Sequence, residues 1–204
     1  ESVVDMIRVA TYITQIPTAL DMVKDAHDKG YETTLNLMAA STVPDRELDE
    51  GLEMLAKSEA GAIYVVDSFG ALYSEQVHFL VKKYMGHCKA TRKEVGVHMH
   101  NNMQLAYANT IEGIIEGANL LDATMAGLGR GAGNCPMELL LGFLRNPKYN
   151  LRPVLDCVQN HIEPMRAKLL WGYDLPYLLT GMLNQHPRTA IKFKEAELKG
   201  VKGD

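Results

Sequence analysis

The feature that most constrains the fold is a regular alternation of short apolar runs with segments of helical period. Each run is rich in β-branched residues, and the segment after it carries apolar residues every three or four positions. Residues 62–67 are almost continuously apolar, as a strand buried on both faces requires. Strands that alternate with helices in this way form βαβ units around a parallel sheet.

The alternation predicts five strands, each followed by a helix. The predicted strands are residues 5–12, 31–38, 62–67, 95–100 and 119–125. The predicted helices are residues 17–29, 105–116 and 136–144, with two more that begin near Asp45 and at a Ser74 cap. A unit length of about 30 residues is that of a (β/α)₈ barrel. We therefore expect an α/β barrel domain over residues 1–146.

The alternation stops near Pro153, and we expect residues 147–204 to form a helical extension. One amphipathic helix is predicted over residues 154–169, followed by an irregular helical segment over 173–190. The charged, glycine-containing residues 195–204 read as a frayed tail.

Composition excludes several classes of protein. The net charge of −4 argues against a nucleic-acid partner or an anionic membrane surface. No apolar run reaches the roughly 18 residues of a membrane span, and the first residues lack the pattern of a signal peptide. The cysteines are three and widely spaced, which argues against a disulfide framework or a CxxC motif. A reducing cytoplasm is the expected location, and Cys135 is expected to be a small buried thiol.

His98 and His100 are the strongest candidates for chemistry. Alternate residues of a strand face the same way, so both imidazoles can reach one metal ion while Met99 faces the other side. Two unrelated histidines, one in the core and one near the surface, remain the alternative. The pair precedes a polar turn at the C-terminal end of a buried strand, where barrel enzymes place catalytic groups.

A glycine-rich loop over residues 126–134 follows the fifth predicted strand. Gly127, Gly129 and Ala132 formally fit a dinucleotide fingerprint, but no later strand supplies the acidic residue that such a site needs. The glycines can instead let the backbone approach a ligand closely. A purely structural tight turn explains them equally well.

Three further polar residues lie on the predicted strands. Asp67 and Ser68 end the third strand, where they can contact a ligand, orient a histidine or cap a turn. Arg8 lies within the first strand, where burial without a carboxylate partner would be costly.

These segments together resemble the 4-hydroxy-2-oxovalerate aldolase branch of the metallo-lyase barrel superfamily, which also holds hydroxymethylglutaryl-CoA lyase and isopropylmalate synthase. The resemblance runs from about residue 6 to residue 144. The matching motifs are IRVATY at 7–12, VVDSFG at 65–70, VHMHNN at 97–102 and LDATMAGLGRGAGNCPMEL at 121–139.

The resemblance implies roles for individual residues. His98 and His100 would bind a divalent metal, often manganese in the family, with magnesium, cobalt or zinc as alternatives. Asn134 matches a loop asparagine that ligates metal in the lyase relatives. Ser68 and His98 would contact the 2-oxo acid. A Gly-Tyr-x-x-x-Tyr segment would bring Tyr173 and Tyr177 to the site as catalytic residues.

Two departures from the family qualify this reading. The lyase's catalytic cysteine corresponds to Gly131, which argues against hydroxymethylglutaryl-CoA lyase activity. The family's strand-1 Arg-Asp pair and general-base histidine have no counterpart. Counted back from the glycine loop, the sequence holds what look like strands 4–8 only, so we expect a partial barrel and a fragment of a longer protein.

The expected enzyme is a metal-dependent aldolase acting next to a 2-oxo acid such as pyruvate, in a cytoplasmic homo-oligomer with no nucleic-acid or membrane partner. A chelated divalent ion acts as a Lewis acid and stabilises the enolate that forms when the carbon–carbon bond breaks. The alternatives are an acyl-CoA-dependent Claisen condensing enzyme, a non-catalytic nucleotide-binding module and a degenerate barrel fragment.

Overall fold

The computed structural model describes residues 2–198. Contacts divide these residues into two compact units. Unit 1 comprises residues 2–68, 73–98 and 110–121, and unit 2 comprises residues 69–72, 99–109 and 122–198. The domain division expected at residues 146–147 stays a prediction. No helix within the described residues is long and apolar enough to cross a membrane.

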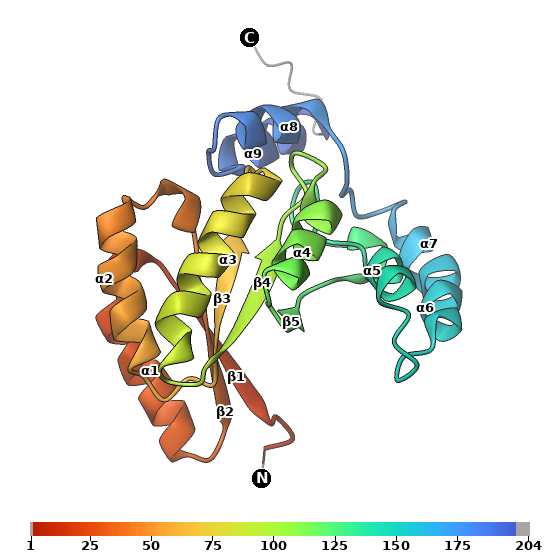
Figure 1. The fold of residues 1–204 in the computed structure, drawn as a ribbon. Coiled ribbons are helices and arrows are strands. Elements are labelled where there is room, and N and C mark those ends of the chain that lie inside the picture. The colour runs from red at the N-terminus through yellow and green to blue at the C-terminus, as the bar shows by residue number, and fades with distance from the viewer. Residues whose placement is uncertain (1, 199–204) are drawn as a thin grey trace. The chain divides into compact units, whose positions relative to one another are not determined.

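A parallel sheet forms the centre of unit 1 (Figure 1). Its strand order within the described residues is β1-β2-β3-β4-β5. Met6 pairs with Glu32, Thr34 with Ala62 and Gly96 with Leu120. The strands are β1 (Met6–Thr11), β2 (Glu32–Leu37), β3 (Ala62–Asp67), β4 (Glu94–Met99) and β5 (Leu120–Leu121).

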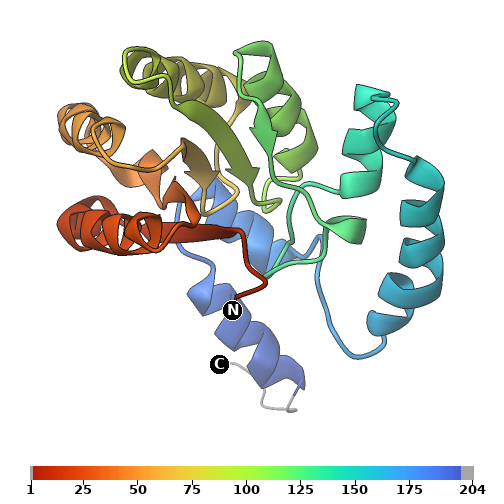
Figure 2. The same cartoon turned by 90° about the horizontal axis from the view of Figure 1, so that it is seen from below.

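Three amphipathic helices cover one face of this sheet, as Figures 1 and 2 show. They are α1 (Ile16–Asp28), α2 (Asp45–Ala56) and α3 (Ser74–Lys89). Each turns an apolar side to the sheet, and Val23, Leu52 and Val81 are completely buried there. Short 3₁₀ turns precede α1 and α2, at Ile13–Gln15 and Ala40–Thr42.

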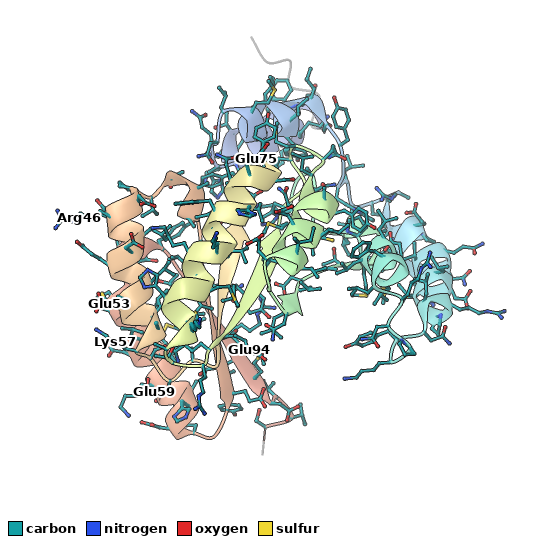
Figure 3. The ribbon with its side chains drawn as sticks, in the orientation of Figure 1. Arg46, Glu53, Lys57, Glu59, Glu75 and Glu94 are labelled. Carbon is teal, nitrogen blue, oxygen red and sulfur yellow. The ribbon has the colours of Figure 1, made fainter. Side chains whose placement is uncertain are left out.

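The outer side of α2 is charged. Arg46, Glu53 and Lys57 point away from the sheet in Figure 3. Arg46 pairs with Glu50 at 2.9 Å, and Lys57 pairs with Glu53 at 2.7 Å, each one helical turn apart. Such exposed pairs keep the helix soluble and add little to the free energy of unfolding.

The opposite face of the sheet is partly open at β1. Met6, Arg8 and Ala10 alternate along this strand and are all exposed. The Arg8 guanidinium stacks on the Tyr64 ring, 4.3 Å from its centroid. The cost of burying Arg8 therefore does not arise, because β1 lies at an edge of the sheet and the side chain reaches solvent. A cavity of about 620 Å³ opens at the N-terminal ends of the strands, lined by residues that include Met6, Thr34 and Ala62.

Unit 2 is made of loops and short helices. Helix α4 (Ala106–Ile115) begins in unit 2, and the glycine loop contains a 3₁₀ turn at Met125–Gly127. The remaining elements are α5 (Met137–Leu144), α6 (Leu151–Cys157), a π-helical turn (Val158–Ile162), α7 (Glu163–Met165), α8 (Leu175–Met182) and α9 (Arg188–Leu198).

The structure confirms the predicted α/β alternation through α5, with two corrections in detail. Strand β5 has two residues rather than seven, because Thr124 is already hydrogen-bonded to the backbone of Cys135 and Met137 in the glycine loop. Ser74 is the first residue of α3 and does not cap it. Tyr73 precedes the helix, and its N–H donates to Gln76 Oε1 at 2.9 Å.

The C-terminal extension also differs from its prediction. The helix expected over 154–169 is present over residues 151–165, but it contains the π-helical turn Val158–Ile162 just before Pro164, which has no N–H to donate, and it ends at Met165 rather than at 169. Helix α9 continues through Leu198, so residues 195–198 are not a frayed tail. Residues 199–204 lie outside the described part of the chain.

Candidate functional site

The two histidines lie at the C-terminal end of β4, as predicted. His98 is within the strand and His100 immediately follows it. Both are half-buried, while Met99 between them is 1% exposed. This alternation agrees with strand geometry, in which His98 and His100 share a face and Met99 points to the other.

Within unit 2, His100 is joined to the glycine loop. It forms an antiparallel bridge with Asn134, and the neighbouring Asn101 N–H donates to the Gly133 carbonyl at 2.9 Å. His100 Nδ1 lies 3.4 Å from the same carbonyl oxygen. If Nδ1 carries the proton and donates it to this oxygen, Nε2 is unprotonated. Its lone pair can then ligate a metal.

Asn134 has an oriented amide with one unsatisfied atom. Its Nδ2 donates to the Leu128 carbonyl at 3.1 Å, and its backbone N–H donates to the Gly127 carbonyl at 3.0 Å. Its Oδ1 is buried without a hydrogen-bond partner among the described residues. Buried oxygen acceptors are rarely left unsatisfied, so this atom is suited to a cation or a ligand donor.

The glycines of the loop are required by close packing. Gly127, Gly131 and Gly133 have φ of 62°, 61° and 86°, which glycine adopts without strain. A Cβ on Gly129 would overlap the Asn134 amide, and a Cβ on Gly133 would overlap the Gly127 carbonyl. The loop therefore has a structural reason for its glycines, which favours the tight-turn interpretation over a dinucleotide fingerprint.

Ser68 directly follows β3 and is 8% exposed. Its Oγ accepts the N–H of Ala39 at 2.8 Å, and Ala39 has a left-handed φ of 55°. This contact supports the turn after β2, which was one of the roles considered for Ser68. Its contact with a substrate stays a prediction.

Tyr173 and Tyr177 belong to a segment that packs on the glycine loop. The Gly172 N–H donates to the Gly131 carbonyl at 3.1 Å, and a Cβ on Gly131 would lie 3.3 Å from the Tyr177 ring. Both tyrosines line a cavity of about 420 Å³ with residues 129–131. Partial burial, and then the nearby Asp174, raises the pKa of Tyr177, so its phenol stays protonated at neutral pH.

Sequence reasoning missed two side chains that hold this loop. Glu138 Oε2 accepts the Ala126 N–H at 3.0 Å, and Trp171 Nε1 donates to the Ala126 carbonyl at 2.9 Å. Neither residue lies in a pattern with a recognisable period. An acidic residue in the first turn of a helix that follows a glycine loop is the only signal that pointed to Glu138.

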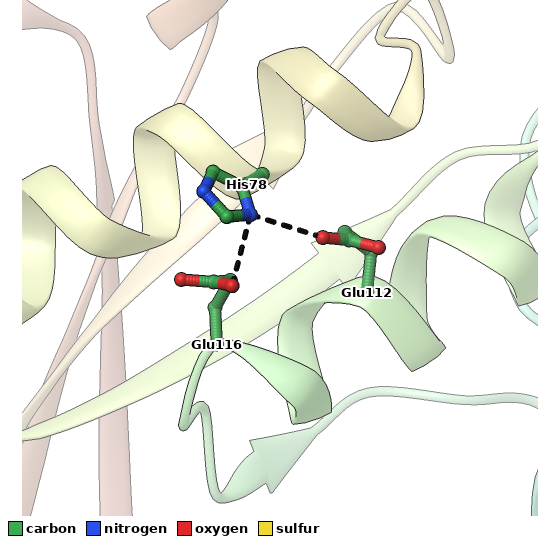
Figure 4. A group of neighbouring side chains, drawn as sticks. All are labelled: His78, Glu112 and Glu116. Carbon is green, nitrogen blue, oxygen red and sulfur yellow. Dashed lines mark hydrogen bonds and ion pairs between the residues drawn. The ribbon is translucent and has the colours of Figure 1, made fainter.

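A second group of possible metal ligands was also missed. His78 on α3 lies beside Glu112 and Glu116, which are one helical turn apart (Figure 4). His78 Nδ1 is 2.9 Å from Glu116 Oε1 and 3.2 Å from Glu112 Oε1. Direct contacts between the imidazole and the two carboxylates explain this arrangement as well as a metal ion would. His78 is therefore the natural control residue for any test of metal binding.

The cysteines behave as expected from their spacing. Cys88, Cys135 and Cys157 are not joined in disulfides, and Cys135 is completely buried. Burial raises the pKa of the Cys88 thiol to about 11, so this thiol is unreactive at neutral pH.

Curated relatives of this chain are named 4-hydroxy-2-oxovalerate aldolase. The protein from Bacillus cereus is 32% identical over 200 residues, which cover 92% of this chain and 57% of the relative. The protein from Thermus thermophilus is 35% identical over 156 residues, which cover 76% of this chain and 44% of the relative. The chain thus spans about half the length of the curated relatives it matches.

Solved structures agree on the fold. The N-terminal domain of a Bacteroides vulgatus protein, provisionally described as an aldolase, is 32% identical with a TM-score of 0.78, and the match covers 93% of this chain and 63% of that one. The HMG-CoA lyase from Bacillus subtilis is 18% identical with a TM-score of 0.70, covering 81% and 65%. At that identity the second match shows a shared fold alone.

A family model gives the assignment. The model described as HMGL-like matches residues 10–160, which is more than half of the 204 residues and includes every sheet strand except the first positions of β1. The chain therefore belongs to the HMGL-like family.

Proposed function

We propose that this chain is part of a divalent-metal-dependent aldolase that cleaves or forms a carbon–carbon bond next to a 2-oxo acid such as pyruvate. The names of the curated relatives support this substrate class. The observation that carries the proposal is the buried, unsatisfied Oδ1 of Asn134 on the loop that is bridged to His100.

His98, His100 and Asn134 would hold the metal through two imidazole nitrogens and one amide oxygen. The family resemblance implies manganese, with magnesium, cobalt and zinc as alternatives. The amide oxygen suits manganese or magnesium, and the imidazole nitrogens suit zinc. When bound, the cation would supply Lewis acidity to the 2-oxo acid.

The remaining groups of the proposed site bind the substrate and handle protons. Ser68 and His98 would contact the 2-oxo acid. Tyr173 and Tyr177 are the proposed catalytic residues. The raised pKa of Tyr177 keeps its phenol protonated, so that it can donate a hydrogen bond to the substrate at neutral pH.

We further propose that β1–β5 correspond to strands 4–8 of a (β/α)₈ barrel. The exposed alternate residues of β1 support this, because that face would be covered in a closed barrel. The other strands, with the arginine and aspartate expected from the family resemblance, would come from residues outside this sequence. A cytoplasmic homo-oligomer stays a prediction, and its size can be measured by light scattering.

The ligand proposal predicts metal content. Purified protein should carry one Mn²⁺ after loading. His98→Ala and His100→Ala each remove a direct ligand and should lower the measured affinity by more than the roughly ten- to hundredfold that loss of an outer partner costs. His78→Ala is the matched control and should leave the affinity unchanged. Unchanged binding in both strand variants would contradict the proposal, and a loss in His78→Ala alone would move the cation to the helix cluster.

The activity is tested by pyruvate release from 4-hydroxy-2-oxovalerate. A longer protein that includes the missing strands should release pyruvate with Mn²⁺ and stop after chelation, while the 204-residue chain should be inactive. Release that survives exhaustive chelation would remove the metal-dependent mechanism. Full activity of the short chain would show that the additional strands are not needed.

A further inference from the structure

We infer that Glu138 and Trp171 are positioning residues that direct the Oδ1 of Asn134, by holding Ala126 in a left-handed backbone conformation. The ligand role of Asn134 rests on the proposed function. The positioning itself rests only on contacts within unit 2.

Ala126 has a backbone conformation that its side chain disfavours. Its φ is 53° and its ψ is 24°, a region that residues with a Cβ seldom occupy. Its N–H donates to Glu138 Oε2 at 3.0 Å, and its carbonyl accepts from Trp171 Nε1 at 2.9 Å. Both polar atoms of this strained residue are thus bound by side chains, which is how surrounding structure maintains such a conformation.

Trp171 is itself fixed. It is 8% exposed, and the Arg166 guanidinium stacks on its ring at 4.1 Å from the centroid. An Arg166 side-chain nitrogen also donates to the Trp171 carbonyl at 3.1 Å. The next residue, Gly172, donates its N–H to the Gly131 carbonyl at 3.1 Å. The segment of Trp171 and Gly172 thus contacts the glycine loop twice, through the indole at Ala126 and through the Gly172 N–H at Gly131.

The conformation of Ala126 decides where Asn134 points. The two residues after Ala126 supply the two carbonyls that Asn134 uses. The Gly127 carbonyl accepts the Asn134 N–H at 3.0 Å, and the Leu128 carbonyl accepts Asn134 Nδ2 at 3.1 Å. A rotation at Ala126 would move both acceptors, and the amide that presents Oδ1 would lose its orientation.

Glu138 could also act only by stabilising α5, and matched variants separate this role from the positioning of Asn134. Glu138 is in the first turn of α5, where a negative charge also interacts favourably with the helix dipole. Glu138→Gln removes that charge but keeps an oxygen that can accept the Ala126 N–H, whereas Glu138→Ala removes both. Glu47→Gln, in the first turn of α2 in unit 1, is the matched control for loss of a first-turn carboxylate.

The first measurement needs no metal. In protein labelled with ¹⁵N-asparagine, the side-chain amide of Asn134 is identified by its absence in Asn134→Asp, and its hydrogen exchange is followed. Glu138→Ala and Trp171→Phe should each speed this exchange at least tenfold. Glu138→Gln and Glu47→Gln should leave it within about twofold. Ala126→Gly should partly restore the slow exchange in Glu138→Ala, because glycine adopts a positive φ without strain.

The second measurement is the affinity for Mn²⁺. Loss of a direct outer partner of a metal ligand typically costs about ten- to a hundredfold in affinity. Because Glu138 and Trp171 act on Asn134 through Ala126, we expect Glu138→Ala and Trp171→Phe to cost about tenfold, the lower end of that range. Glu138→Gln should bind Mn²⁺ with nearly the same affinity as the protein without substitutions. If Glu138→Ala fails to fold, Trp171→Phe carries both measurements.

The outcomes separate the two proposals. An Asn134 amide that exchanges at the same rate in Glu138→Ala and Trp171→Phe would overturn the positioning inference, whatever the metal result. An equal increase of the Asn134 amide exchange rate in Glu138→Gln and Glu138→Ala would also overturn the positioning inference. The charge of Glu138, and not its hydrogen bond to Ala126, would then be what matters. Faster exchange in a protein that never binds Mn²⁺ would uphold the positioning and contradict the proposed metal site.

Discussion

The helices of unit 1 bury continuous apolar faces against its sheet, whereas the glycine loop of unit 2 is held by single hydrogen bonds from side chains to backbone atoms. In unit 1, completely buried residues recur at helical and strand spacing, as at Val23, Leu35, Leu52, Val65 and Val77. In unit 2, the helices leave large apolar residues about half exposed, as at Leu139, Phe143, Leu155, Leu179 and Met182. The core of unit 1 is therefore stabilised by many apolar contacts, whereas the glycine loop of unit 2 depends on a few specific hydrogen bonds.

This difference has consequences for mutation. An apolar core loses free energy in proportion to the volume removed, and its neighbours share the loss. A loop held by individual hydrogen bonds responds sharply at a few positions and hardly at all at others. Three sets of substitutions test whether the two units differ in this way.

The largest effect is expected in the core of unit 1. Leu52 on α2 is completely buried, so Leu52→Ala should lower the free energy of unfolding by about 3 kcal/mol. Leu155→Ala in unit 2 removes the same atoms from a side chain that is 48% exposed, and should cost less than about 0.5 kcal/mol. Urea unfolding followed by far-UV circular dichroism measures both. Similar losses in the two variants would show that helix packing in unit 2 is as demanding as in unit 1.

The next effect is expected at the glycine loop. Gly133 has a φ of 86°, and a Cβ there would overlap the Gly127 carbonyl. A left-handed conformation and the displaced carbonyl together predict that Gly133→Ala costs about 2 kcal/mol. The sole tryptophan, Trp171, contacts this loop, so its fluorescence during unfolding is the measurement.

Gly142 is the matched control for Gly133. It lies inside α5, and a Cβ added there would meet no atom within 4 Å. Gly142→Ala should raise stability by about 0.5–1 kcal/mol, because alanine favours helix. If Gly133→Ala were as harmless as Gly142→Ala, the loop would be more adaptable than its contacts indicate.

The same difference decides how much of the fold follows from the sequence. Strands β1–β4 and helices α1–α5 have periodic apolar residues, and their positions were predicted to within one or two residues at most ends. Strand β5 was predicted too long because Thr124 is recruited by the loop at Cys135 and Met137, a non-local contact that no local pattern records. The π-helical turn before Pro164 fits a residue that cannot donate an N–H, although the amphipathic period continues across it.

From the residue pattern alone, the candidate site could be predicted only at His98 and His100, whereas the roles of Ser68, Asn134, Tyr173 and Tyr177 came from the family resemblance. His98 and His100 could be identified because a strand has a period of two and their side chains are chemically distinctive. Glu138 and Trp171 could not, because each acts on one backbone atom of Ala126 from 12 and 45 residues away. The left-handed φ of Ala126 was also hidden, since alanine gives no hint of it.

The smallest effect is expected at the surface ion pairs of unit 1. Asp49 on α2 accepts hydrogen bonds from Lys83, with both oxygens 2.8 Å from Nζ, and lies 2.9 Å from His87 Nε2. These bonds, that of Lys83 first, hold the pKa of Asp49 below 3.8. A carboxylate whose pKa is lowered by folding stabilises the protein above its unfolded pKa, and the contribution is lost as the pH falls through the folded value.

Asp49→Asn should therefore lower Tm slightly at pH 7, and the difference should shrink as the pH falls below about 4. Asp21→Asn, at an exposed aspartate on α1, is the charge-matched control for the loss of one carboxylate. The effect should be small because exposed pairs are well solvated. A loss at Asp49 as large as that of Leu52→Ala would mean that specific polar contacts, and not only the apolar core, hold unit 1 together.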